Sequence, residues 1–187
     1  MRALAVTLAA VALSACCIQM PQPIVRPDPT NGPTVPTGAP QWPAGALQLG
    51  VSEGGIGGDF TPIGNTVQLV SGPQGGGGRH VFLNFRVVGQ TPTNELYILT
   101  RANRVSDGKF IGSAEQPMGF DIGDAGTSDG TYSYRLVLCP TPTGVNIVDQ
   151  DLTIEAYAFS RQGGTYLAKA SATVKAQCSG CQPECGG

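Results

Sequence analysis

Four cysteines in the C-terminal part of the chain have the residue type and spacing for covalent or metal chemistry. They are Cys139, Cys178, Cys181 and Cys185, and the last three form a C-x2-C-x3-C pattern in a Gly- and Pro-rich tail. In an oxidising compartment, four cysteines predict two disulfides, for which three pairings exist. We favour Cys139–Cys178, which would tie two strand ends together, with Cys181–Cys185 closing the tail. A zinc or iron–sulfur site with four thiolate ligands is the alternative.

His80 is the only histidine in the chain. A Ser–His–Asp or Cys–His device would therefore have a single candidate base, and no G-x-S-x-G pentad accompanies it. At the start of a strand, a lone histidine is expected to be a hydrogen-bonded residue on the rim of the fold. As a metal ligand it would contribute only one imidazole.

Three aspartates, Asp121, Asp124 and Asp129, lie in a Gly-rich stretch and could offer oxygen ligands to calcium. Their spacing does not match an EF-hand loop, so we expect a solvated turn from Asp124 to Gly130. Taken together, these residues predict a protein that is not an enzyme and that carries no cofactor.

The loop Gly72-Pro73-Gln74-Gly75-Gly76-Gly77-Gly78-Arg79-His80 is the most glycine-rich stretch of the chain. A phosphate-binding P-loop needs Gly-Lys-Ser/Thr leading into a helix, whereas this loop runs into a strand and has no lysine. Loops on a rigid scaffold often carry recognition, so Gln74, Arg79 and His80 are the candidate binding residues.

The N-terminal residues have the pattern of an export signal. Met1-Arg2 supplies one positive charge, and residues 3–13 are apolar apart from Thr7, which makes a signal-peptide core too short to span a bilayer. The run Leu13-Ser14-Ala15-Cys16 resembles a bacterial lipobox. The resemblance implies cleavage after residue 15, a diacylglycerol thioether on Cys16 and attachment to a bilayer. Ordinary secretion with cleavage near Ala15 is the alternative.

The residue after the lipidated cysteine indicates whether the inner or the outer membrane is the expected location. Cys17 occupies that position instead of the Asp associated with inner-membrane retention, and this favours the outer membrane of a Gram-negative cell. Two or three acyl chains make such attachment effectively permanent.

A proline-rich stretch follows the anchor. Eight prolines fall between Pro21 and Pro43, which favours extended, solvated chain, and we place the anchor and a disordered linker at residues 16–44. Trp42, the only tryptophan, is expected to mark where the linker meets the domain.

Period-two alternation of apolar residues predicts strands through residues 45–178. The clearest run places Val81, Leu83, Phe85 and Val87 on one face and His80, Phe82, Asn84 and Arg86 on the other. Asp107-Gly108 and Gln162-Gly163-Gly164 predict hairpins, and residues 119–122 a short edge strand. Residues 166–177 also suit a helix by composition, but their period of two favours a strand.

Seven to nine short strands predict an all-β fold, an antiparallel two-sheet sandwich. An immunoglobulin-like arrangement is favoured and a jelly roll is the alternative. The sandwich takes residues 45–178, and a Cys/Gly-rich tail takes residues 179–187.

The run Val70-Ser71-Gly72-Pro73-Gln74-Gly75-Gly76, with His80 before a long apolar strand, resembles small lipoproteins of myxobacteria and related Gram-negative bacteria that carry a G-P-Q-G-G-x-H loop. Two further glycines and Arg79 separate the Gly75-Gly76 pair from His80 in this chain. The resemblance implies a sandwich fold and an envelope location, and it implies no chemistry.

The content of charged residues limits the kinds of partner that the protein is expected to bind. Charged residues make up 13% of the chain and the net charge is −2, so a nucleic-acid partner is not expected. The sequence predicts a non-catalytic binding or structural module displayed on an acyl anchor, with an envelope protein or a glycan as candidate partner. A metal-handling protein using His80 or the tail cysteines, or a hydrolase, is the alternative.

Overall fold

The computed structural model describes residues 32–52, 59–71, 78–92, 95–123, 126–139 and 144–179. All the regular elements in these ranges are β-strands. No helix among them is long and apolar enough to cross a membrane.

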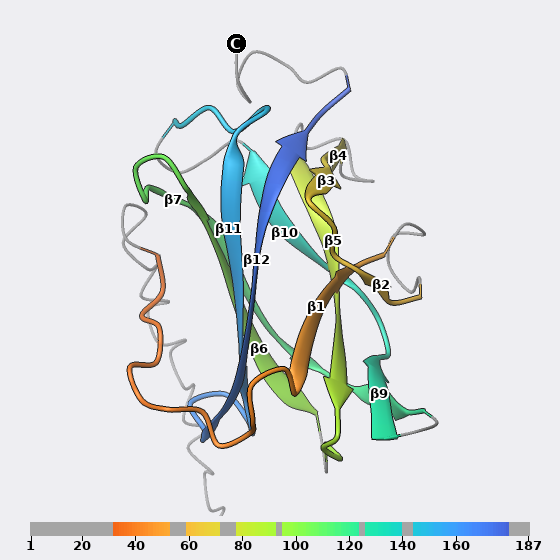
Figure 1. Cartoon of the computed structure of the whole chain (residues 1–187). Coiled ribbons are helices and arrows are strands. Elements are labelled where there is room, and N and C mark those ends of the chain that lie inside the picture. Colours follow the sequence, from red (N-terminus) through yellow and green to blue (C-terminus); the bar gives the residue numbers. More distant parts are fainter. Residues whose placement is uncertain are drawn as a thin grey trace, which may run out of the picture.

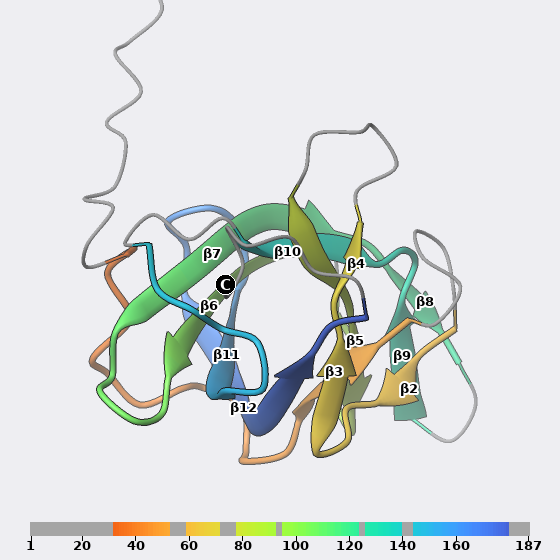
Figure 2. The ribbon, with the colours of Figure 1, turned by 90° about the horizontal axis from the view of Figure 1, so that it is seen from above.

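The described residues contain twelve strands, which form two sheets that face each other across one core (Figures 1 and 2). Sheet A contains β1 (Leu47–Val51), β2 (Thr61–Pro62), β4 (Val70–Ser71), β5 (Arg79–Val88), β8 (Phe120–Ile122), β9 (Thr127–Gly130) and β10 (Tyr134–Cys139). Sheet B contains β3 (Thr66–Gln68), β6 (Leu96–Arg104), β7 (Phe110–Met118), β11 (Asp151–Phe159) and β12 (Tyr166–Gln177). The predicted all-β sandwich is confirmed.

The order of the strands is that of an immunoglobulin-like sandwich. Sheet B places β6, β11 and β12 side by side, as in the C-F-G order of that fold, and sheet A places β5 between β1 and β10, as in A-B-E. One pairing differs from the expected antiparallel pattern, because β3 runs parallel to β12.

Residues 66–71 are divided between the two sheets. Their first part, β3, pairs with β12 of sheet B, and their second part, β4, pairs with β5 of sheet A. Leu69 lies at the crossover with 3% of its surface exposed, and its N–H donates to the carbonyl of Gln177. The chain thus fastens the two sheets together at this edge.

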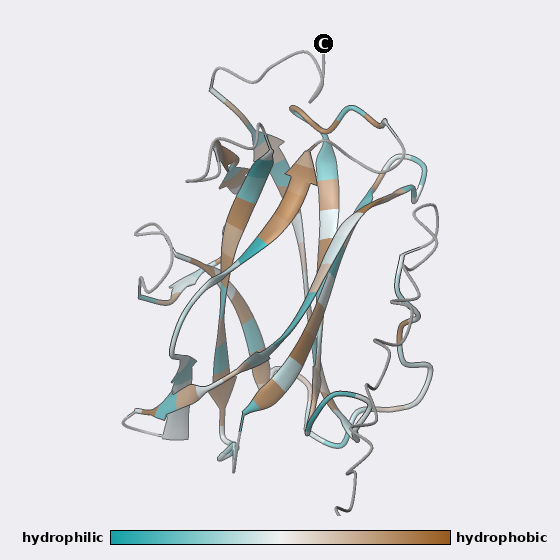
Figure 3. Ribbon diagram, turned by 180° about the vertical axis from the view of Figure 1, so that it is seen from behind, coloured by the Kyte–Doolittle hydropathy of each residue, from teal (hydrophilic) through white to brown (hydrophobic). Residues whose placement is uncertain are grey.

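The core is formed by the apolar residues that alternate with polar ones along the strands. The inner side chains of β5, Val81, Leu83, Phe85 and Val87, are at most 3% exposed. Apolar and polar bands alternate along the strands in Figure 3. Burying a side chain of this size contributes about 1.5–3 kcal/mol, so a few such strands suffice to hold the sheets together.

Both predicted hairpins and the final strand are confirmed. Gly108 turns the chain between β6 and β7 with φ +69°, and Gly163 turns it between β11 and β12 with φ +64°. Residues 166–177 form β12, paired with β11 along nearly its whole length. This pairing decides between strand and helix, because it offers backbone partners that local propensity does not anticipate.

The expectation of a solvated loop from Asp124 to Gly130 is wrong for its second half. Residues 127–130 form β9, which lies between β5 and β8 and buries Ser128 to 3% exposure. No apolar alternation marks this strand, since its neighbours supply the backbone hydrogen bonds that hold it.

The proline-rich region does not stay free of the domain up to residue 44. Residues 32–46, here called the N-terminal strap, lie along the outside of sheet B (Figure 1). The Gln41 and Trp42 N–H groups donate to the carbonyls of Tyr166 and Leu167, at 3.2 and 2.7 Å. The Trp42 side chain packs against the core, so this residue does mark the docking point as expected.

Close approach of the two sheets at one edge depends on Gly112 of β7. A Cβ atom at this position would lie 2.5 Å from the backbone carbonyl oxygen of Val137 on β10, which cannot move without shifting its strand. We therefore expect Gly112→Ala to lower the free energy of unfolding by about 1–3 kcal/mol in urea denaturation. Gly38→Ala is the matched control, since its Cβ would meet nothing within 4 Å. Equal stability of the two variants would contradict this packing.

Candidate functional site

The histidine that the sequence singled out lies in a row of side chains on the outer face of sheet A. His80 is directly opposite Val70 on one neighbouring strand and Val137 on the other. The two valines are 37% and 49% exposed, and they are two of the four large hydrophobic side chains exposed among the described residues. Phe82 and Arg135 form the adjacent row, so an apolar patch with one cation surrounds the histidine.

The expectation that His80 is a hydrogen-bonded rim residue is wrong. Its side chain is only 2% exposed, its ring meets Phe82 edge-on at 4.7 Å, and its Nε2 atom has no hydrogen-bond partner in the described part of the chain. Burial, and to a lesser degree the positive charge of Arg135, lower the pKa of His80 below 6.5. The imidazole is therefore held neutral and serves as an apolar, aromatic element of the patch.

The other two residues of the candidate loop are placed less completely. Arg79 begins β5 and lies between Ser71 and Cys139, on the strands to either side. Gln74 lies outside the described residues, as does Cys16.

Two of the four C-terminal cysteines are described, and they occupy the same end of the sandwich. Cys139 ends β10 and is fully buried, while Cys178 directly follows β12 and is partly buried against the core. A register shift between Val137 and Cys139 turns Cys139 inward, which supplies the strand-end twist that its alternation with Arg135 requires. Cys181 and Cys185 lie outside the described residues.

The aspartates do not assemble a calcium site in the described part of the chain. Asp129 is held by Arg86 through two hydrogen bonds of 2.5 and 2.8 Å, and the guanidinium also lies 4.4 Å from the ring centre of Phe60. The hydrogen bond to Asp129 raises the pKa of Arg86. Asp121 lies opposite Asp129 on β8, and no three acidic, histidine or cysteine side chains of the described ranges converge.

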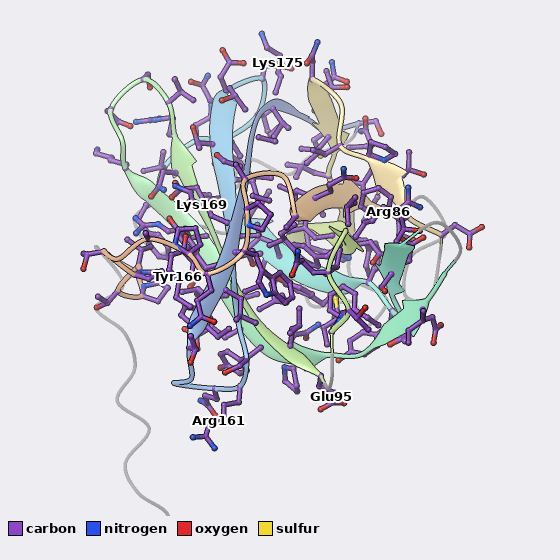
Figure 4. All side chains as sticks on the ribbon, turned by 60° about the horizontal axis from the view of Figure 1, so that its bottom comes forward. Arg86, Glu95, Arg161, Tyr166, Lys169 and Lys175 are labelled. Carbon is purple, nitrogen blue, oxygen red and sulfur yellow. The ribbon has the colours of Figure 1, made fainter. Side chains whose placement is uncertain are left out.

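A second surface, which the sequence did not indicate, lies on the outer face of sheet B. Tyr97, Phe159 and Tyr166 are directly opposite one another on β6, β11 and β12. The next row contains Glu115, Leu99, Tyr157 and Lys169. Figure 4 shows Tyr166 and Lys169 on the side of the molecule that the strap crosses, away from Arg86.

The sequence did not indicate this face, because a β-bulge reverses the side of the sheet on which Tyr166 lies. The sequence alternation puts Tyr166 on the same side as Ala168, but a register shift between Ala158 and Phe159 places Tyr166 opposite Phe159 instead. Its ring then lies 5.8 Å from that of Phe159 on the outer face. The one available signal was the outward parity of Tyr97 and Phe159 relative to their buried neighbours.

A hollow of about 170 Å³ opens in this face, lined by Thr34, Tyr97, Leu99, Glu115, Phe159, Gln162 and Gly163. The Tyr97 hydroxyl donates to Oε2 of Glu115 at 2.8 Å. Burial first, and then this contact, raise the pKa of Tyr97 to about 12. Close by, the Lys169 ammonium pairs with Glu155 at 2.6 Å and lies 5.2 Å from the ring centre of Tyr157.

The lowered pKa of His80 predicts a loss of stability in mild acid. Above about pH 6.5 the imidazole is neutral in both the folded and the unfolded chain, and the full stability is present. As the pH falls below 6.5, the unfolded chain binds a proton that the folded chain resists, so folding is disfavoured. We expect the Tm of the wild type to fall more between pH 7.5 and pH 5.5 than that of His80→Gln, as followed by calorimetry. Parallel pH profiles for the two proteins would contradict the neutral, buried imidazole.

No family model and no curated protein matches the sequence. Among solved structures, a β-glucuronidase of Bacteroides uniformis is similar at a TM-score of 0.35 and 10% identity, over 70% of this chain and 13% of that one. A bacterial adhesin of Mobiluncus mulieris that contains intramolecular disulfide, isopeptide and ester cross-links is similar at a TM-score of 0.38 and 10% identity, over 70% of this chain and 58% of that one. The present chain thus spans less than two thirds of either protein.

Proposed function

We propose that the protein is a lipoprotein of a Gram-negative outer membrane whose immunoglobulin-like sandwich is a non-catalytic binding or structural module. The observation that carries the proposal is the docking of the strap. The segment that leads from the lipobox cysteine is hydrogen-bonded to β12 through Gln41 and Trp42. A tether joined to the domain in this way would hold the sandwich in a restricted orientation toward the bilayer.

The length of chain before the strap bounds how far the domain can stand from the membrane. Fifteen residues, 17–31, separate Cys16 from the strap. A chain of that length reaches at most about 50 Å when fully extended. A partner in the same membrane or in the adjacent envelope layer is therefore within reach.

Three carboxylates of the described residues are held in ion pairs. Asp129 is engaged by Arg86, Asp107 by Arg104 and Glu155 by Lys169. These pairs tie neighbouring strands or a turn together and leave each carboxylate in contact with a cation.

The anchor is tested by labelling cells with a palmitate analogue. Cys16→Ala removes the sulfur that would carry the diacylglycerol, so we expect labelling to be lost and the protein to leave the membrane fraction. Cys17→Ala is the matched control and should retain the label. Loss of label from Cys17→Ala alone would place the anchor one residue later, and label on Cys16→Ala would disprove the assignment.

We further propose that the C-terminal cysteines form the disulfides Cys139–Cys178 and Cys181–Cys185. Cys139 ends β10 and Cys178 directly follows β12, at the same end of the sandwich. Cys139 is paired with Arg79 of β5, and β4 pairs with the same residue from the other side. Cys178 follows Gln177, whose carbonyl accepts the N–H of Leu69 just before β4. Closing a loop of about forty residues contributes about 4 kcal/mol in the chain-entropy model.

This framework is tested by peptide mapping without reduction. We expect the peptide that contains Cys139 to be linked to the single C-terminal peptide that contains Cys178, Cys181 and Cys185, with no free thiol in either. We also expect no bound zinc or iron by elemental analysis and a clear drop in Tm on reduction. Four alkylatable thiols, or one metal ion per chain, would favour the thiolate site instead.

A further inference from the structure

The hollow on the outer face of sheet B has one flat apolar side. Tyr97 and Phe159, both lining residues, are directly opposite each other on β6 and β11, and Tyr166 continues the same row on β12. All three are half-buried, with their rings on the side of the sheet away from the core. Such a row gives a ligand with an apolar ring face an area to stack on.

The hollow also offers a ligand a polar group with a fixed orientation, which is the carboxylate of Glu115. Its Oε2 atom accepts the Tyr97 hydroxyl at 2.8 Å, which fixes the direction of the carboxylate. The side chain also lines the hollow. Thr34 and Gln162, also in the lining, add a hydroxyl group and an amide that can both donate and accept.

The charge of the lining selects among ligands. Glu115 is the one ionisable acid in it, and no lysine or arginine is present among the lining residues. A phosphate, a carboxylate or an anionic sugar would meet an unpaired negative charge and is disfavoured. The mixture of amide, hydroxyl and carboxylate suits a ligand with several hydroxyl groups better than a simple cation, which would need more aromatic faces around it.

The size of the hollow limits the ligand to one ring. Its volume of about 170 Å³ is below the roughly 300–1,000 Å³ of most drug-sized sites. Thr34 of the strap and the turn at Gln162-Gly163 both contribute to its lining. A single sugar ring, stacked by its C–H face on the aromatic row and bonded by its hydroxyl groups to Glu115, meets these conditions.

We propose that this hollow binds one ring of a neutral saccharide, such as the end of an envelope or extracellular glycan. The site rests on the proposed role of the sandwich as a non-catalytic binding module, and it gives that module a ligand class. The strap forms part of the site through Thr34, so the segment that would orient the domain toward its membrane also shapes the ligand pocket.

The test uses the full chain, purified in detergent, and ligand-observed NMR with glucose, galactose, mannose and N-acetylglucosamine, followed by the β-1,4 disaccharides of those that bind. We expect at least one neutral sugar to bind saturably. We expect Glu115→Gln to weaken binding of that sugar about tenfold or more, because the charged carboxylate acceptor is replaced by a neutral amide. Phe159→Ala should weaken it about fivefold to tenfold through loss of stacking.

Two controls keep the test independent of folding. Asp121→Asn changes an acid and Ile122→Ala an exposed apolar side chain on β8 of the other sheet, and both should bind as the wild type does. Far-UV circular dichroism and the Tm are measured for every variant, and the exposed position of Glu115 makes its variant the decisive one.

Three results would overturn the inference: no binding by any of the sugars, binding that the Glu115 and Phe159 variants leave unchanged, or displacement of the sugar by tetramethylammonium at lower concentration. None of these results bears on the acyl anchor, so the failure of this inference is distinguishable from failure of the proposed lipoprotein. Chemical conversion of a bound sugar during the experiment would instead confirm the site and contradict the non-catalytic role.

Discussion

Sheet A depends on the burial of β5 from both sides. Four strands, β1, β4, β9 and β10, hydrogen-bond to it along its two edges. Its inner side chains fill the core, and on its outer face His80 and Asn84 are also almost fully buried. A strand covered on both faces has no room for a charged imidazole, which explains in physical terms why His80 is held neutral there.

The outer faces of the two sheets have different chemistry because different groups cover them. On sheet A, Phe60 lies over Gly50 and the Arg86–Asp129 pair, next to the patch around His80. On sheet B, the strap covers part of the face and leaves the aromatic row beside a hollow. The face of sheet A therefore combines apolar side chains with cations, and the face of sheet B combines aromatic rings with a carboxylate.

Local patterns in the sequence predicted the elements that depend on local chemistry. The alternation in β5, the turns at Gly108 and Gly163, and the docking of Trp42 are all correct, since a side-chain period, a positive φ or a lone large aromatic specifies each. The path of β9 and the position of the strap could not be predicted in this way, because distant backbone groups hold them. The same is true of Tyr166, whose orientation is set by a bulge in the pairing of β11 with β12.

The candidate sites differ in the same way, since some are marked by local sequence and another is formed by distant segments. The sequence indicated His80 and the cysteines, whose residue types are rare in this chain, but it assigned the histidine to the wrong environment. The hollow on sheet B draws its lining from the strap, three strands and a turn, so no spacing along the chain marks it.

The central claim is that a lipid-tethered sandwich works by contact rather than by bond-making, and its tether is open to a direct measurement. The N-terminal peptide of the protein extracted from its native membrane should begin at Cys16 and carry the mass of a diacylglyceryl group and, where the amine is acylated, of one further acyl chain. A mass that matches the unmodified polypeptide, from the membrane or from a soluble fraction, would contradict the account.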